Sequence, residues 1–101
     1  MTAENKNHEN YLKVAEKVKE IVHSIDPNAR IYVFGSVVRG TATAMSDIDI
    51  LVITRIIERK YDIMVKVYKA VEENVELHVV TEEILEKWYK RFIPDKELIE
   101  V

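Results

Sequence analysis

The feature that most constrains the fold of this chain is a pair of apolar runs joined by a short polar segment. The runs are Ile31–Phe34 and Ile48–Ile53, and each has the length of one buried strand. The segment between them contains both glycines of the chain, Gly35 and Gly40. Because glycine permits tight turns and a close approach of the backbone, this pattern predicts a strand, then a short helix with a loop, then a second strand.

Two carboxylates stand at the start of the second run, in the segment Ser46-Asp47-Ile48-Asp49. Successive side chains of a strand point to opposite faces, so Asp47 and Asp49 are expected to share one face. At about 4 Å and an effective dielectric constant of about 20, their repulsion would be roughly 4 kcal/mol. Folding alone does not explain such a cost, and a divalent cation removes it. Mg²⁺ prefers carboxylate and phosphate oxygens, so Asp47 and Asp49 are predicted to bind metal.

The residues directly after the first run suit a phosphate group. Gly35 allows the backbone to approach a ligand closely, and Ser36 is a good cap for a short helix. The main-chain N–H groups at the start of a helix attract anions. Gly35 and Ser36 are therefore candidate phosphate-binding residues between the two predicted strands.

Gly35-Ser36, then ten residues, then the two aspartates, resembles the signature of nucleotidyltransferases of the DNA polymerase beta superfamily. The resemblance is closest to the minimal nucleotidyltransferases, short single-domain members that are often paired with a HEPN-domain protein. It implies that Gly35 and Ser36 bind the phosphates of a nucleotide, that Arg39 and Ser46 belong to the same nucleotide site, and that the aspartates hold two Mg²⁺ ions.

The resemblance also implies a third carboxylate from a later strand. The run Val75–Val80 places Glu76 and His78 on one face, and Glu76 is predicted to bind the second metal and to accept a proton. The family usually has aspartate there. The alternative for Glu76 is an exposed position on an edge strand. His78 is interpreted as a satisfied structural residue, with a substrate contact as the alternative.

Apolar periodicity predicts the remaining elements. Helices are expected over 9–25, within 57–73 and from 82 to 92, and strands over 30–34, 47–53 and 75–80. Thr81 is expected to cap the last helix, and the tail 98–101 to pack or pair. The fold class is therefore α/β (α+β). The resemblance implies a nucleotidyltransferase core, with a small mixed sheet of three or more strands and helices packed on one face.

Two helices are rich in aromatic residues, and these are expected to lie in the core. In the last helix Trp88 is the expected anchor. In the helix within 57–73 the expected buried stripe consists of Tyr61, Met64, Val65, Tyr68 and Val71.

Length and composition limit the class of protein. With 101 residues the chain is expected to form one domain, 1–101, in which residues 1–8 are flexible. It has no cysteine, which excludes disulfides and thiolate sites. No apolar run approaches the roughly 20 residues of a membrane span, and the polar N-terminus is no signal peptide. These features favour the cytoplasm. A net charge of −3 gives no general attraction to nucleic acid.

The resemblance implies an enzyme that transfers a nucleoside monophosphate, in the simplest case AMP from ATP, to an acceptor hydroxyl with the help of Mg²⁺. ATP or another nucleoside triphosphate would be the donor, and a HEPN-family protein or a second copy of the chain the partner. Such a protein can serve as the antitoxin of a toxin–antitoxin pair. The alternative is a non-catalytic module that binds a nucleotide or a partner and neutralises a HEPN protein by complex formation. The sequence leaves the acceptor and the base open.

Overall fold

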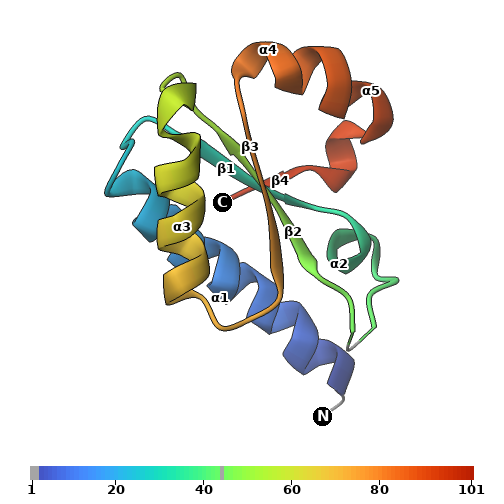
Figure 1. Cartoon of the computed structure of the whole chain (residues 1–101). Coiled ribbons are helices and arrows are strands. Elements are labelled where there is room, and N and C mark those ends of the chain that lie inside the picture. Colours follow the sequence, from blue (N-terminus) through green and yellow to red (C-terminus); the bar gives the residue numbers. More distant parts are fainter. Residues whose placement is uncertain (1–2, 44) are drawn as a thin grey trace.

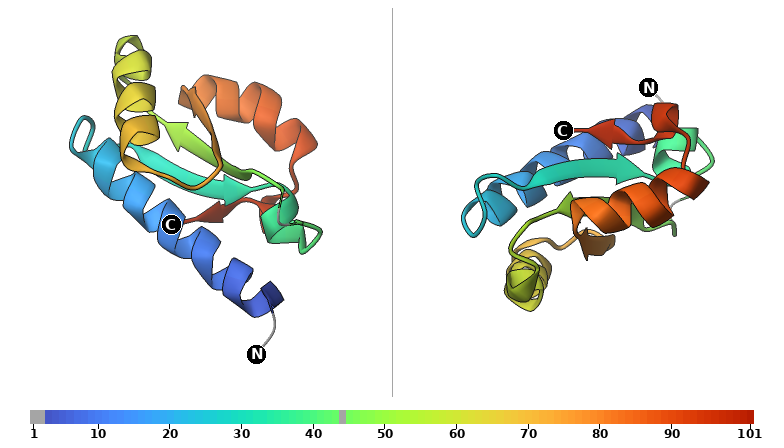
Figure 2. Two further views of the ribbon diagram at one scale, coloured as in Figure 1. Left: turned by 60° about the horizontal axis from the view of Figure 1, so that its bottom comes forward. Right: turned by 90° about the horizontal axis from the view of Figure 1, so that it is seen from above.

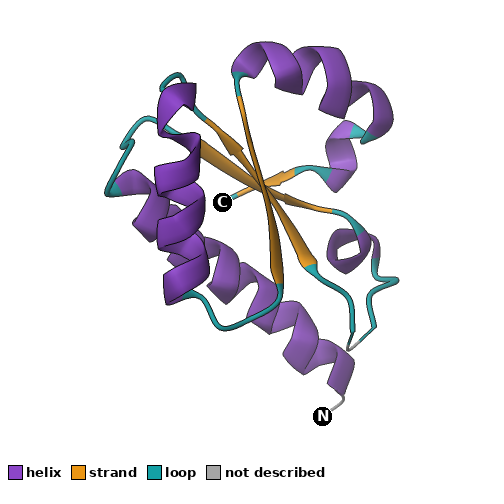
Figure 3. Ribbon diagram, viewed as in Figure 1, coloured by secondary structure: helices purple, strands orange, loops and turns teal. Residues whose placement is uncertain are grey.

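The computed structural model describes residues 3–43 and 45–101, with side chains from residue 11 onward. A mixed sheet of four strands in the order β3-β2-β1-β4 forms its centre (Figures 1 and 3). Its strands are β1 (Arg30–Phe34), β2 (Ile48–Ile53), β3 (Val75–Val80) and β4 (Ile99–Glu100). β1 pairs antiparallel with β2 and β4, whereas β2 and β3 are parallel. The bounds of β1 and β3 are those predicted, and β2 begins one residue later.

One face of the sheet is covered by the two long helices, α1 (Ala3–His23) and α3 (Lys60–Ala70). The side chains that alternate inward along the strands form the main core with them: Ile31, Val33, Ile50, Val52, Val75, Leu77 and Val79. This confirms the predicted mixed sheet, with the two long helices packed on one face. Helix α1 starts six residues before the predicted residue 9 and ends two before residue 25. Its end is a turn in which the Asp26 N–H donates to the Val22 carbonyl at 2.8 Å.

The opposite face, called the second face below, carries a smaller core of Tyr32, Leu51, Ile53 and Leu85. A C-terminal helical segment covers it, formed by α4 (Glu82–Ile84), the π-helical turn Leu85–Tyr89 and α5 (Lys90–Phe92). In the right-hand view of Figure 2, α1 lies behind the strands and this segment lies in front. As predicted, Thr81 caps the segment, because its hydroxyl accepts the Ile84 N–H at 3.3 Å.

The expectation that Trp88 anchors this segment in the core is wrong. Trp88 is 56% exposed and Phe92 is 75% exposed, whereas Leu85 is completely buried. The reason is the π-helical turn at Leu85–Tyr89. A π turn holds more residues than an α turn, so a stripe spaced for 3.6 residues per turn does not remain on one side.

The buried stripe of α3 also differs from the expected one. Ile63 and Val67 are its buried residues, and Val71 follows them at the end of the helix. Tyr61, Val65 and Tyr68 are exposed. The helix has apolar residues on more than one side, so periodicity alone did not separate the core face from the outer face.

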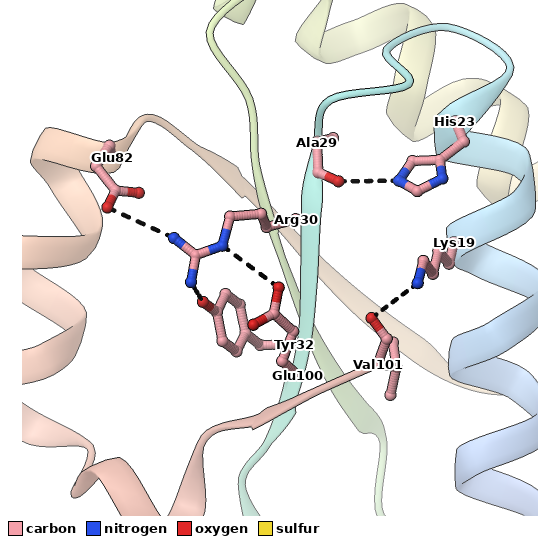
Figure 4. A network of polar contacts seen from close by, with 8 residues as sticks. All are labelled: Lys19, His23, Ala29, Arg30, Tyr32, Glu82, Glu100 and Val101. Carbon is pink, nitrogen blue, oxygen red and sulfur yellow. Dashed lines mark hydrogen bonds and ion pairs between the residues drawn. The ribbon is translucent and has the colours of Figure 1, made fainter.

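The C-terminal tail pairs with the sheet, as predicted, and a group of polar contacts holds it there (Figure 4). On the second face, Arg30 contacts Glu100 of β4 at 3.3 Å and Glu82 of α4 at 3.7 Å. Its guanidinium also donates to the Tyr32 hydroxyl. On the other face, Lys19 of α1 donates to the main-chain oxygen of Val101 at 3.1 Å.

No helix in the described part of the chain is both long and apolar enough to span a bilayer.

Candidate active site

The middle strand β2 determines which residues meet. Asp49 lies opposite Phe34 of β1 on one side and opposite Glu76 of β3 on the other. Gly35 follows Phe34 directly. The C-terminal end of β1 and the N-terminal ends of β2 and β3 therefore lie together at one end of the sheet. The side chains of Asp49 and Glu76 project on the second face, because their strand neighbours belong to the main core.

Asp49, Glu76 and His78 form a compact group of possible metal ligands. One ligand atom from each lies within 4.8 Å of the others. His78 Nε2 is 3.7 Å from Asp49 Oδ1 and 3.9 Å from Glu76 Oε1. Asp49 and His78 are about three-quarters buried, whereas the Glu76 side chain is 57% exposed. Asp47 lies just before β2, is exposed and is outside this group.

The structure places Glu76 at an exposed position on an edge strand and also beside Asp49, whereas its metal-binding role stays a prediction. Its strand β3 is an edge strand of the sheet, and its carboxylate nevertheless lies beside Asp49. The exposed position and the proximity to Asp49 are compatible because Glu76 is at the open end of the parallel β2–β3 pair.

The electrostatics of Asp49 are unfavourable for its charged form. Burial raises the pKa of Asp49, and the nearby carboxylate of Glu76 raises it further. His78 opposes this rise but is the smaller influence. The like charge that raises the pKa of Asp49 thus comes from the neighbouring strand. A bound cation would stabilise the ionised form of both carboxylates.

Gly35 occupies a position that no other residue can take without a rearrangement. Its φ is +87° and its ψ is −156°, a backbone conformation that is open essentially to glycine. A Cβ atom at this position would collide with Oδ2 of Asp49 and lie 3.1 Å from its Cγ. The glycine-serine step therefore packs directly against Asp49, as the predicted site requires.

A short helix, α2 (Ser36–Arg39), follows Gly35 and ends at Gly40, whose φ is +78°. The N–H groups of Val38 and Arg39 both donate to the Gly35 carbonyl at 3.1 Å. Val37 and Val38 pack against the main core. These two valines thus hold the helix on the sheet, with Ser36 at its first position.

Arg39 and Ser46, the other predicted nucleotide-binding residues, lie on either side of the loop between α2 and β2. The guanidinium of Arg39 is half exposed and 3.8 Å from the Glu97 carboxylate. The hydroxyl of Ser46 accepts the Thr43 N–H at 3.0 Å and so closes the turn before β2. Nucleotide binding by these two residues remains a prediction.

For His78 the sequence favoured a satisfied structural residue and gave a substrate contact only as the alternative, whereas the structure places its ring in the group with Asp49 and Glu76. Its Nδ1 lies 3.2 Å from the Tyr89 hydroxyl, and its ring packs between Phe34 and Tyr89 with centroid distances of 5.3 and 5.8 Å. Its Nε2 is buried and has no hydrogen-bond partner in the described part of the chain. The signal in the sequence was its position two residues after Glu76 on the same face.

The group fits a divalent cation. Carboxylate oxygens and a neutral imidazole nitrogen are both metal ligands, and Nε2 of His78 is a buried ligand atom with no hydrogen-bond partner among the residues that the structure describes. The arrangement of Gly35 against Asp49 leaves the start of α2 next to these ligands. A metal-assisted reaction of a phosphate compound is the chemistry that such an arrangement supports.

The chain is similar to known nucleotidyltransferases. The model of the nucleotidyltransferase domain family matches residues 15–101. A crystal structure from Sulfolobus solfataricus, provisionally named a nucleotidyltransferase, matches with a TM-score of 0.71 and 28% identity, over 99% of this chain and 86% of that one. A second, with the same provisional name, has a TM-score of 0.69 and 31% identity, over 85% of this chain and 95% of that one. No protein of curated function matches significantly.

Proposed function

This chain belongs to the nucleotidyltransferase domain family, and from that premise we propose that it transfers a nucleoside monophosphate, in the simplest case AMP from ATP, to an acceptor hydroxyl. The observation that supports this most strongly is that Gly35, Asp49 and Glu76 lie together at one end of the sheet. The glycine-serine step and the carboxylates come from three different strand ends. Their meeting is a property of the fold and not of a single motif.

The proposed roles follow the position of each side chain. Gly35 and Ser36 bind the phosphates, with Arg39 and Ser46 at the border of the same site. Asp49 and Glu76 would hold the divalent ions, together with Asp47 as the resemblance implies, although Asp47 lies outside their group. Mg²⁺ is the family-based expectation. When bound, such ions neutralise the charge of the triphosphate and of the transition state.

The reaction is an in-line displacement at the α-phosphorus. A bond forms between the acceptor oxygen and this phosphorus, while the bond to the oxygen that bridges the α- and β-phosphates breaks. Pyrophosphate leaves with that oxygen. Glu76, more exposed than Asp49, accepts the proton of the hydroxyl. Correct positioning by the protein carries much of the rate in such a step.

A second candidate function is binding to a protein partner without catalysis. It is favoured by exposed apolar side chains that gather on two helical segments: Tyr61, Val65 and Tyr68 on α3, and Trp88 and Phe92 near the C-terminus. A HEPN-family protein or a second copy of the chain is the proposed occupant, and an antitoxin role would follow from the former. This function requires neither Asp49 nor Glu76.

The test is the Glu76→Gln variant, which removes the charge and keeps the size of the side chain. Label transfer from α-labelled ATP to total small RNA and to total cell protein would be measured together with ATP affinity. We expect transfer at least about a hundredfold slower, the lower end for loss of a general base, with ATP affinity changed only a few-fold. An interaction made mainly in the transition state has this signature.

The matched control is Glu73→Gln, which removes an exposed carboxylate just before β3 and should leave transfer unchanged. Undiminished transfer by the Glu76 variant would remove this residue from the mechanism. If the wild-type protein transfers no label to either pool but still binds a partner protein, the binding function is the correct one.

A further inference from the structure

We propose that Nε2 of His78 is a ligand of the metal at this site, and that this nitrogen makes the site prefer a first-row transition ion, such as Mn²⁺, over Mg²⁺. The proposal rests on the proposed metal site and adds to it a residue outside the carboxylate motif. It is carried by three observations: ligand spacing, an unpaired buried nitrogen, and the partner of the other ring nitrogen.

The spacing of the three ligand atoms suits one ion. Ligand atoms about 2.1 Å from a metal are about 3.0 Å apart at a right angle and about 4.2 Å apart when opposite. The distances from His78 Nε2 to Asp49 Oδ1 and Glu76 Oε1, 3.7 and 3.9 Å, lie in this range. They are too long for hydrogen bonds. The three ligand atoms therefore lie close enough to share one ion, and Nε2 forms no hydrogen bond with either carboxylate.

The buried Nε2 atom of His78 is the second observation, because a polar atom in this position normally has a hydrogen-bond partner or a metal. This atom is buried and has no hydrogen-bond partner among the described residues. An unpaired buried polar atom destabilises the fold, and most such atoms in proteins are paired. The groups that face it are the carboxylates of Asp49 and Glu76. A cation between the three groups would pair the nitrogen and relieve the repulsion of the carboxylates together.

The Tyr89 hydroxyl is placed to accept from Nδ1–H of His78, the ring form that a metal needs. Histidine ligands usually donate the N–H of their second nitrogen to a neighbour, which fixes the tautomer and the ring orientation. Nδ1 of His78 is 3.2 Å from the Tyr89 hydroxyl. When Nδ1–H donates to this hydroxyl, Nε2 carries a free lone pair directed at the carboxylates. Phe34 and Tyr89 pack against the ring and hold it in this orientation.

The ligand set determines the preferred ion. Mg²⁺ binds oxygen almost exclusively, whereas imidazole suits transition ions. A site of carboxylates alone would discriminate weakly between Mg²⁺ and Mn²⁺. One imidazole nitrogen added to Asp49 and Glu76 shifts the affinity ratio toward Mn²⁺.

A different role for His78 makes the opposite prediction. A protonated His78 would act as a fixed counter-charge to Asp49 and Glu76 and would compete with any metal ion. Removing it would then raise the affinity for both Mn²⁺ and Mg²⁺. The two roles therefore differ in the sign of the effect.

The experiment compares the full-length wild-type protein with His78→Gln, and uses His23→Gln as the matched control. The Nε2 atom of His23 donates to the Ala29 carbonyl at 2.9 Å (Figure 4). Ala29 precedes β1, at the end of that strand opposite the one paired with Asp49. Free Mn²⁺, followed by its EPR signal, gives the Mn²⁺ affinity, and displacement by Mg²⁺ gives the second affinity. Pulsed EPR of bound Mn²⁺ detects a directly coordinated nitrogen, and thermal melting verifies that each variant is folded.

We expect a nitrogen coupling in the wild type and in His23→Gln that is absent in His78→Gln. The ratio of Mn²⁺ to Mg²⁺ affinity should fall at least about tenfold in His78→Gln, the size seen for metal-site partners. If His78→Gln does not fold, Tyr89→Phe replaces it: the ring packing stays, the hydroxyl is lost, and the ratio should fall less.

The proposal is overturned if wild-type Mn²⁺ shows no nitrogen coupling, or if removing His78 leaves the ratio unchanged or raises both affinities. These results are independent of catalysis. Transfer of label without nitrogen coupling would overturn the role of His78 and keep the proposed function. Nitrogen coupling without transfer would do the reverse.

Discussion

The two ends of the second face differ in how their charges are balanced. At one end, Arg30 has two carboxylate partners and a hydroxyl around it, and its hydrogen bond with Glu100 is the main cause that raises the pKa of its guanidinium. At the other end, Asp49 faces a like charge on Glu76 and a histidine nitrogen that has no hydrogen-bond partner among the described residues. The charge of Arg30 is thus balanced by its neighbours, whereas the charges of Asp49 and Glu76 repel each other.

This difference separates residues that serve the fold from residues that serve a ligand. The Arg30 contacts join β1 to β4 and α4, so they hold the C-terminal tail in place. The contact between Asp49 and Glu76 joins no segments that the β2–β3 ladder does not already join. Folding therefore does not account for the repulsion between these two carboxylates, and a bound cation would relieve it.

The largest effect should come from the glycine that packs against this group. Gly35→Ala places a Cβ into Asp49 and demands a positive φ, so we expect a loss of about 2–5 kcal/mol in the free energy of unfolding. Gly40→Ala is the matched control: its φ is also positive, but its Cβ would meet nothing within 4 Å, so about 1–2 kcal/mol should be lost. Urea denaturation measures both. Equal losses would show that the contact with Asp49 is unimportant.

The next effect concerns the free energy of unfolding of the metal-free protein. Ionised Asp49 lowers it by an amount that depends on pH. The raised pKa means that the folded protein binds this proton more tightly than the unfolded chain, so ionisation of Asp49 destabilises the fold. The destabilisation is complete above the folded pKa and vanishes as the pH falls below the ordinary value of 3.8. Asp49→Asn should therefore be more stable than wild type at about pH 7, with an advantage that shrinks toward about pH 4. An advantage that does not change with pH would contradict this.

The smallest effect is expected at the Arg30 end of the second face. The Arg30 side chain is 47% exposed, and exposed ion pairs contribute about 0–1 kcal/mol. Arg30→Gln should therefore lower the free energy of unfolding by at most about 1 kcal/mol, less at high salt, and should leave nucleotide transfer unchanged. Calorimetry with the transfer assay tests this. A large loss of transfer would show that the two ends are coupled.

Sequence reasoning predicted those parts of the molecule in which one local pattern dominates. The apolar runs ending at Phe34 and Val80 gave β1 and β3 their correct bounds, and the Thr81 cap was recognised by its residue type. The exposure of Trp88 was not predictable, because a π-helical turn changes the spacing on which the helical stripe depends.

The site was only partly predictable for a related reason. Gly35 and Asp49 belong to a local motif, and their contact follows from it. The neighbours of Asp49 across the sheet depend on the register of β2 with β3, which pairs Asp49 with Glu76 and Leu51 with His78. No pattern within one strand contains that register, so the buried nitrogen of His78 was found only in the structure.

The most direct test of the central claim, that the Asp49 end is built around a cation, is the melting temperature of wild type and Asp49→Asn with EDTA and with Mn²⁺. The variant should melt higher in EDTA because it lacks the buried like charge. With Mn²⁺ at about 100 times its dissociation constant, the wild type should gain about 2.7 kcal/mol and melt above the variant. A reversal of order between the two conditions is the predicted result. If Mn²⁺ does not shift the wild type, or if the variant melts lower in EDTA, the claim is contradicted.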